Sequence, residues 1–218
     1  MFDSDWFKNL DFKLRNAGLD SDSFSFDDIL GLLKHKTKLS SDGFALQSVY
    51  VILASGFSQK TAKRIFEKIS CKLKSEGAEF DDLIKIFNNK NKINAICKIW
   101  VNRDEYCHKY YELHNIADRL KYLATLPHIG KITANHLARN LGEDIVKYDI
   151  WIQRLGVLFS GDDSLLQKID NGCLDSKVKF YCDKMFDCLV QETGLPRGYI
   201  DVVLWRACQN GFIKDLKK

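Results

Sequence analysis

Residues 122–155, YLATLPHIGKITANHLARNLGEDIVKYDIWIQRL, predict two helices joined by a tight turn and followed by one carboxylate, Asp149. Before the turn, apolar side chains over residues 116–124 recur every three or four positions, which is typical of one face of a helix. Pro127 cannot continue that helix and biases the residue before it away from helical angles, so we expect the helix to end near Thr125. The stretch therefore indicates a helical hairpin with an acid shortly after it.

The second half of the hairpin begins at Gly130. This residue has no side chain to hold another molecule away, and a helix that starts here leaves its first amide donors unpaired. Such donors suit a phosphate oxygen. We therefore expect the turn to contact a nucleic-acid backbone through His128, Ile129, Gly130, Lys131 and Ile132.

The hairpin resembles the helix-hairpin-helix segment of the DNA glycosylase superfamily that includes endonuclease III and the 8-oxoguanine glycosylases. In that family a Leu-Pro-Gly-apolar-Gly turn precedes a helix that often starts Thr-Ala, and an aspartate opens the next helix. LPHIGKITA and Asp149 match this pattern, and His128 stands where the family usually has the first glycine. The resemblance implies an all-α fold of two lobes with a cleft between them. By spacing alone, the segment is equally typical of a helix-turn-helix connection in a helical core.

Two compatible roles are expected for Asp149. It precedes apolar residues that repeat as a buried helix face, so its carboxylate is expected to cap that helix. The resemblance implies that Asp149 is also the catalytic acid, which assists water at the sugar carbon or stabilises positive charge on the deoxyribose as the base leaves. Helix amides and the helix dipole keep a carboxylate ionised near neutral pH, which suits both roles.

The resemblance also bears on cleavage of the DNA backbone. Family members with lyase activity use a lysine directly before the Thr-Ala pair, and its amine forms a Schiff base with the sugar. That position is Ile132 here, and the neighbouring Lys131 is turned away by one helical step of about 100°. We therefore predict a monofunctional glycosylase that leaves an abasic site. A bifunctional glycosylase/lyase is the alternative.

Other site residues are nominated by their position in the chain. The cations beside the hairpin or the acid, and thus the expected phosphate contacts, are Lys131, Arg139, Lys147 and Arg154. Aromatic faces commonly receive a base that has left the duplex stack, although most aromatic residues at helical spacing are core. The candidates for the base pocket, or for a wedge that fills the vacated stack, are Phe57, Gln59, Tyr148, Trp151, Asp201 and Trp205.

Charge is distributed unevenly along the 218 residues. The formal net charge is +4, yet residues 1–30 hold seven acids against three bases, a sum of −4, so the remainder carries +8. The positive charge of the remainder of the chain suits a surface that binds phosphate. We expect a monomer that binds double-stranded DNA containing a damaged or modified base, although the sequence does not identify the base. A non-catalytic helix-hairpin-helix DNA-binding module and a helical protein-interaction domain are the competing functions.

Seven cysteines, an odd number without clustered pairs, predict reduced thiols, no metal held by side chains and no iron-sulfur cluster. The resemblance implies a monovalent cation at hairpin carbonyls. The acidic amino terminus is followed by no long apolar run, and the apolar stretch over residues 44–57 is too short and mixed to span a bilayer. We expect a cytoplasmic protein, associated with the nucleoid if it is bacterial.

The rest of the chain shows helical periodicity, and no alternating stretch predicts a sheet. We expect one domain, with residues 42–145, including the hairpin at 115–142, as one lobe, and residues 1–41 and 146–218 as the second. The further helices are expected over residues 5–17, 26–36, 42–55, 58–75, 79–88, 91–112, 163–170, 175–193 and 196–210.

Overall fold

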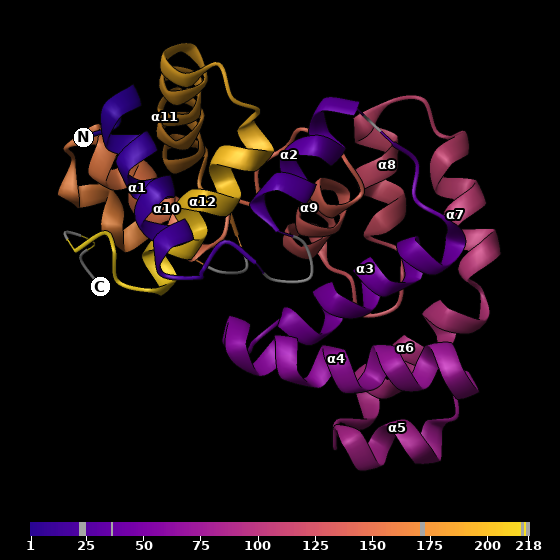
Figure 1. Ribbon diagram of the computed structural model, residues 1–218. Helices are drawn as coiled ribbons and strands as arrows, with labels where there is room; N and C mark the ends of the chain where they lie inside the picture. Colours follow the sequence, from indigo (N-terminus) through magenta and orange to yellow (C-terminus); the bar gives the residue numbers. More distant parts are fainter. Residues whose placement is uncertain (22–24, 36, 171–172, 215, 217–218) are drawn as a thin grey trace. The chain divides into compact units, whose positions relative to one another are not determined.

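The structure, a computed structural model, describes residues 1–21, 25–35, 37–170, 173–214 and 216, apart from the side chain of Gln59. Every regular element in these residues is helical (Figure 1). The β pairing that they contain is confined to two isolated bridges, Ser21 with Ser25 and Ile169 with Leu174. The predicted all-α class is confirmed.

Backbone contacts divide the chain into two compact units. Unit 1 contains Met1–His35 and Asp144–Lys218, and unit 2 contains Lys36–Glu143. These boundaries lie a few residues from those we expected for the two lobes. The hairpin therefore belongs to unit 2, and Asp149 belongs to unit 1.

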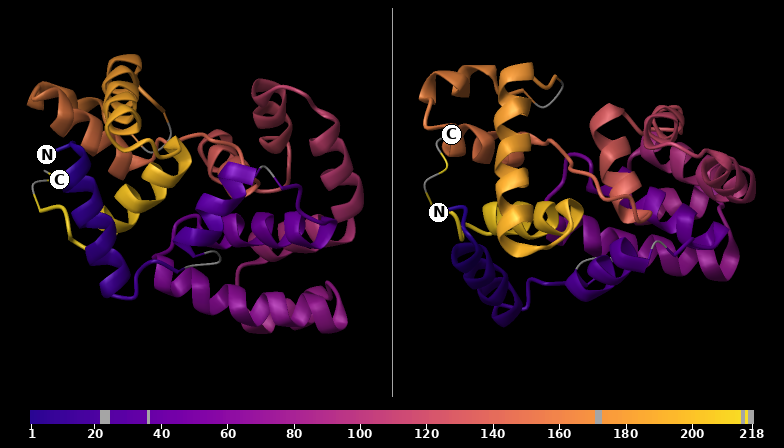
Figure 2. Two further views of the ribbon diagram at one scale, coloured as in Figure 1. Left: turned by 45° about the horizontal axis from the view of Figure 1, so that its top comes forward. Right: turned by 90° about the horizontal axis from the view of Figure 1, so that it is seen from above.

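Unit 1 is built around the pairing of two helices near the carboxyl end, α10 and α11, which lie side by side in both views of Figure 2. Its core is apolar, and α12 packs against α1, α2, α10 and α11. The elements of unit 1 are α1 (Ser4–Asn16), α2 (Phe26–His35), α10 (Ile150–Ser160), the 3-10 helix η1 (Asp163–Lys168), α11 (Ser176–Thr193) and α12 (Arg197–Gln209).

Unit 2 surrounds a central helix, α3 (Ser41–Ala54), which contacts α4, α6, α7 and α9. Side chains on all sides of α3 are buried, as expected of a helix with apolar residues around its whole circumference. The buried Gln47 of α3 accepts a hydrogen bond from Asn140 of α9 at 3.0 Å. The remaining helices are α4 (Gln59–Glu76), α5 (Phe80–Ile86), α6 (Lys90–Val101), α7 (Arg103–Glu112), α8 (Ile116–Leu123) and α9 (Lys131–Asn140).

Helix starts follow the capping signals in the sequence. A side-chain oxygen before the first turn accepts an amide hydrogen that the helix itself leaves unpaired, which is worth about 1 kcal/mol per cap. The caps with such a bond include Asp3, Ser40, Ser58, Asn89, Asn115, Asp149 and Asp175. No helix in the described part of the chain is both long and apolar enough to cross a membrane.

Two predicted helices were wrong in detail. The single helix expected over residues 91–112 is two helices, α6 and α7, because the helix is interrupted at Asn102. The Asn102 side chain donates to the Lys98 carbonyl at 2.8 Å, and Arg103 donates to the Trp100 carbonyl at 2.8 Å, so side chains satisfy the carbonyls at the end of α6. The helix expected over 163–170 is the shorter η1.

Candidate active site

The hairpin consists of α8 and α9, which pack against each other, and the turn between them (Figure 1). In the turn, His128 has φ 62, in the left-handed region that favours glycine. This is the position where the resembled family has its first glycine. The turn thus adopts a left-handed backbone at a residue that has a side chain, at a cost of about 1–2 kcal/mol.

Two of the turn amides are not the free donors that we predicted. The Ile129 amide donates to the Leu126 carbonyl at 3.1 Å, and the Gly130 amide donates to the Thr133 hydroxyl at 2.7 Å. That hydroxyl in turn donates to the Gly130 carbonyl at 3.0 Å. For Gly130, the prediction failed because it overlooked a threonine in the first turn of α9, whose hydroxyl can bond back to the chain before the helix.

The amides of Lys131 and Ile132 lack an acceptor among the described residues, and they lie at the start of α9. The Lys131 side chain is exposed and Ile132 is half-buried. Arg139 is only 5% exposed, so its expected contact with phosphate was wrong. Of the amides of residues 129–132, which we predicted to bind phosphate, only those of Lys131 and Ile132 are therefore left without an acceptor among the described residues, and their contact with phosphate stays a prediction.

Glu143, which follows the second helix of the hairpin, connects that end of the hairpin to α7 and α8. Glu143 forms an ion pair with Arg119 of α8 and accepts a hydrogen bond from the Tyr110 hydroxyl at 3.1 Å. Arg119 also donates to the Leu113 carbonyl at 2.9 Å. Burial of the Tyr110 hydroxyl, reinforced by Glu143, raises its pKa well above the usual value, so this hydroxyl stays a donor. The two contacts of Glu143 were not predicted, because they join residues 24 and 33 positions apart.

The turn carbonyls bear on the monovalent cation that the resemblance implies. The Gly130 carbonyl already accepts hydrogen bonds from Ala134 and from the Thr133 hydroxyl. Other carbonyls of the turn would have to supply the ligands, so this cation stays a prediction. Within the described residues, no group of three or more His, Cys, Asp or Glu side chains is placed to hold a metal, and the seven cysteines are free thiols.

Asp149 caps α10 from a nearly buried position. Its Oδ1 accepts hydrogen bonds from the amides of Trp151 at 3.0 Å and Ile152 at 3.3 Å, so the predicted capping role is confirmed. Its Oδ2 lies 3.2 Å from the Lys147 Nζ, and the two side chains are only 12% and 17% exposed. Two amides at a helix amino terminus and an ammonium group therefore surround this carboxylate and fix its orientation.

Lys147 links the acid to α12. Its Nζ lies 5.4 Å from the ring centroid of Trp205, and its backbone amide donates to the buried Asp201 at 3.3 Å. The pKa of the buried Cys208 thiol is raised, chiefly by burial and then by the negative charge of Asp149. The structure thus brings Lys147, Asp149, Asp201 and Trp205 together. The Lys147–Asp149 pair could have been found in the sequence, because alternate residues of an extended segment point to the same side.

Each aromatic candidate has a cation over one face of its ring. The distances to the ring centroids are 4.8 Å for Lys92 over Phe57, 5.0 Å for Lys179 over Tyr148, 5.3 Å for Arg154 over Trp151 and 5.4 Å for Lys147 over Trp205. A face covered in this way is shielded from a stacking base. At most one face of each ring is therefore left for a nucleobase.

The Phe57 ring is braced from two sides. It is 39% exposed, and it meets Phe87 edge to face at 5.6 Å. The buried Lys92 donates to the Ser55 carbonyl at 2.5 Å, where α3 gives way to the loop before α4, and burial lowers its pKa. Gln59 begins α4, but its side chain lies outside the described part of the structure. An exposed ring on a supported loop suits a wedge, and that role stays a prediction.

Tyr148 has less freedom than the other candidates. Its hydroxyl donates to Asp183, which is also paired with Lys179 at 2.6 Å. Burial and the Asp183 charge raise the pKa of Tyr148 well above its usual value, so the hydroxyl stays protonated. We therefore favour a supporting role for Tyr148.

The predicted site residues fall into two groups. Unit 2 holds the hairpin residues and Phe57, whereas unit 1 holds Asp149, its neighbours and Arg154. The action of both groups on one DNA duplex stays a prediction.

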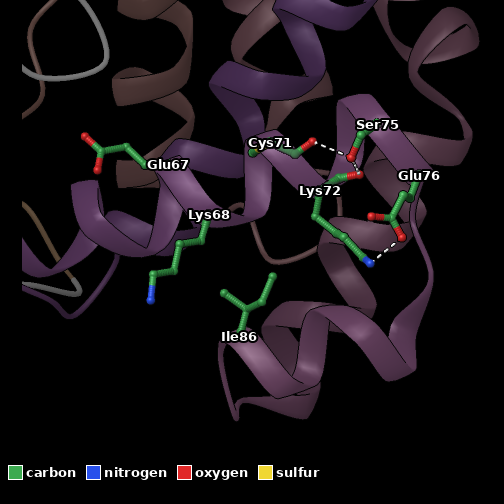
Figure 3. Close-up of a pocket in the computed structure, with 7 residues that line it drawn as sticks. All are labelled: Glu67, Lys68, Cys71, Lys72, Ser75, Glu76 and Ile86. Atoms are coloured by element: carbon green, nitrogen blue, oxygen red, sulfur yellow. Dashed lines mark hydrogen bonds and ion pairs between the residues drawn. The ribbon is translucent and has the colours of Figure 1, made fainter.

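Two cavities in unit 2 contain none of the predicted site residues. An open groove of about 510 Å³ lies between α4 and Ile86 of α5, and Figure 3 shows Lys72 directed toward Glu76 along its edge. A more enclosed cavity of about 290 Å³ adjoins the Arg119–Glu143 pair and is lined by polar side chains that include Lys38 and His114. Neither cavity adds a residue to the candidate site.

Comparison with known proteins gives structural matches only. No protein-family model and no curated protein matches the chain. The 8-oxoguanine DNA glycosylase of Thermotoga maritima is 17% identical, with a TM-score of 0.63 over 98% of this chain and 99% of that one. The Methanocaldococcus jannaschii 8-oxoguanine glycosylase/lyase, in complex with a 15mer DNA containing 8-oxoguanine, is 18% identical, with a TM-score of 0.67 over the same shares. The chain therefore has the fold of these two proteins along nearly its whole length.

Proposed function

We propose that this chain, whose fold is that of helical DNA glycosylases, hydrolyses the N-glycosidic bond of a damaged or modified base in duplex DNA. The product is an abasic site. Asp149 carries this proposal, because it is a nearly buried carboxylate fixed by two helix amides and an ammonium group. A structural cap needs the amides alone. The paired lysine and the neighbouring Trp205 supply the setting of a reacting acid.

Asp149 is the essential acid in this proposal. As the base leaves, positive charge develops on the deoxyribose ring, and a carboxylate already oriented in a site of low water content stabilises it without reorganisation. The same carboxylate can orient the attacking water. Base release is hydrolytic here, because Ile132 stands at the position where the resembled lyases carry an amine.

The amides of Lys131 and Ile132, together with the exposed Lys131 side chain, are the phosphate contacts in this proposal. Trp205 is the favoured ring for the everted base, because it is joined through Lys147 to the acid. 8-Oxoguanine is the first base to test, since both structurally similar proteins are 8-oxoguanine enzymes.

The test is incubation with a panel of duplexes that each carry one damaged or modified base, followed by hot alkali to reveal abasic sites. Asp149→Asn should lower base release by at least about 100-fold while keeping the fold, because asparagine is also a good helix cap. Asp175→Asn is the matched control. Asp175 caps α11 through the amides of Lys177 and Val178 and is paired with Lys168 at 3.4 Å.

The control should keep full activity, so that loss confined to Asp149→Asn separates catalysis from capping. Full activity in Asp149→Asn would remove this residue from the mechanism. DNA binding without release of any base in the panel would favour the non-catalytic module. Failure to bind DNA even at low salt would favour a protein-interaction domain, since contacts with phosphate are strongest at low salt.

A further inference from the structure

Lys147 has a setting that phosphate binding does not explain. We expected it on a DNA-binding surface, yet its side chain is only 17% exposed, and its ammonium group lies between the Asp149 carboxylate and the Trp205 ring. By contrast, Lys131 at the start of α9 is exposed. An amine held beside the proposed catalytic acid suits chemistry at the sugar.

We propose that Lys147 is the nucleophile of a lyase step that cuts the DNA backbone at the abasic site. This inference rests on the proposed function and departs from the monofunctional enzyme predicted from the sequence. Ile132 removes the amine at the position expected from the resemblance, and Lys147 supplies another at 3.2 Å from the acid. Any sugar carbon that reaches Asp149 therefore comes close to this amine.

The Lys147–Asp149 pair can change its protonation between the two steps. During base release, the Lys147 ammonium group lies 3.2 Å from the Asp149 carboxylate and holds it in position. The abasic sugar then opens to an aldehyde at C1′. The Lys147 ammonium passes a proton to Asp149, and the neutral Nζ adds to C1′ to form a carbinolamine. Asp149 returns that proton to the departing hydroxyl, so that water leaves and a protonated imine forms.

Strand cleavage follows from the same pair. Asp149, again ionised, takes a proton from C2′, and the electrons of that bond expel the phosphate oxygen at C3′. Asp149 passes the C2′ proton to the departing phosphate, and water hydrolyses the remaining protonated imine to an aldehyde, which restores the Lys147 ammonium group. The sequence consumes one water for the water released earlier, and it needs neither an oxidant nor a reductant.

The surrounding contacts fix the position of this amine. The Lys147 backbone amide is bonded to Asp201 of α12, and the Asp149 backbone amide donates to the Lys147 carbonyl at 2.8 Å. The Lys147 Nζ also contacts the face of the Trp205 ring, 5.4 Å from its centroid. A side chain already confined in this way loses little further freedom when it attacks, which favours the intramolecular step.

The experiment uses DNA with a preformed abasic site, so that it does not depend on base release by this protein. Borohydride reduces a protonated imine to a stable amine, and a covalent protein–DNA adduct is then visible on a denaturing gel. The full chain should form the adduct, and peptide mapping by mass spectrometry should place it on Lys147. Lys147→Arg should lose it, because a guanidinium keeps the positive charge but cannot form the imine.

Lys179→Arg is the matched control, because Lys179 also pairs with a carboxylate, Asp183, and lies over an aromatic ring, Tyr148. It should form the adduct as the unchanged chain does. Thermal unfolding of each variant checks its fold, and mapping on the unchanged chain tests the assignment if Lys147→Arg does not fold.

Each outcome bears on one proposal. No adduct from the unchanged chain, or an adduct mapped to another residue, would overturn the role of Lys147 and leave base release by Asp149 standing. An adduct on Lys147 without release of any base in the panel would support the amine chemistry and overturn the proposed glycosylase function.

Discussion

At the scale of single residues, His128 is where this chain departs from the turn that it resembles. Its φ of 62 lies where a side chain crowds the backbone, and its exposed position offers little packing in return. The pKa of its imidazole is lowered by partial burial and by the Lys92 ammonium, so the neutral form is favoured. His128 thus keeps the backbone of the turn strained without itself adding a charged side chain.

We predict that His128→Gly stabilises the protein by about 0.5–1 kcal/mol. Relief of left-handed strain, about 1–2 kcal/mol, exceeds the entropic cost of glycine, about 0.5–1 kcal/mol. Urea unfolding measures the difference. His114→Gly is the control, because His114 is an exposed loop residue without positive φ, and it should destabilise. Equal destabilisation by both changes would show that His128 is not strained.

At the scale of elements, the contact between α10 and α11 depends on a glycine. A Cβ on Gly156 would lie 2.4 Å from the Cys182 sulfur and 2.9 Å from its backbone nitrogen, so the helices could not keep their spacing. The Cys182 thiol donates to the Ile152 carbonyl at 3.4 Å in the same contact. Because Asp149 caps the start of α10, this packing also sets where the proposed acid lies.

We predict that Gly156→Ala destabilises the protein by about 1–3 kcal/mol through overpacking. Gly31→Ala in α2 is the matched control, because nothing lies within 4 Å of its added Cβ. That change should stabilise by about 0.5–1 kcal/mol through helix propensity alone. Urea unfolding of both variants gives the comparison, and a neutral Gly156→Ala would show that the two helices separate easily.

At the scale of the whole molecule, charge separates along the chain, with −4 in residues 1–30 and +8 in the remainder. Such an excess favours association with DNA and makes it sensitive to salt. Among the amides of residues 129–132, which we predicted to bind phosphate, those of residues 131 and 132 are the ones left without an acceptor in the described part of the chain. If they bind phosphate, the number of phosphates neutralised there contributes to the salt dependence.

We predict that DNA affinity falls steeply with salt, and that Lys131→Ala lowers the slope of log affinity against log salt by about 1. Fluorescence anisotropy with one duplex at several salt concentrations measures this slope. Lys85→Ala on α5 removes the charge of another exposed lysine, whose side chain is 73% exposed, and should leave the slope unchanged. The same slope in Lys131→Ala as in the unchanged chain would place the phosphate contact elsewhere.

The sequence by itself determined the helices, most of their starts, the all-α class and the cap formed by Asp149. These features follow local rules, since caps, turns and apolar periodicity are set within about one helical turn. The break at Asn102 and the bond from Gly130 to Thr133 were also local, but their short-range signals were overlooked.

Only the tertiary structure decided the surroundings of that cap. Lys147 meets Asp201 and Trp205 across more than fifty residues of sequence, and Lys92 meets the Ser55 carbonyl across 37. Burial likewise excluded Arg139 from the surface. Such contacts depend on how distant helices pack, which periodicity along one segment does not specify. The chemistry proposed for Lys147 therefore emerged from folding rather than from any motif.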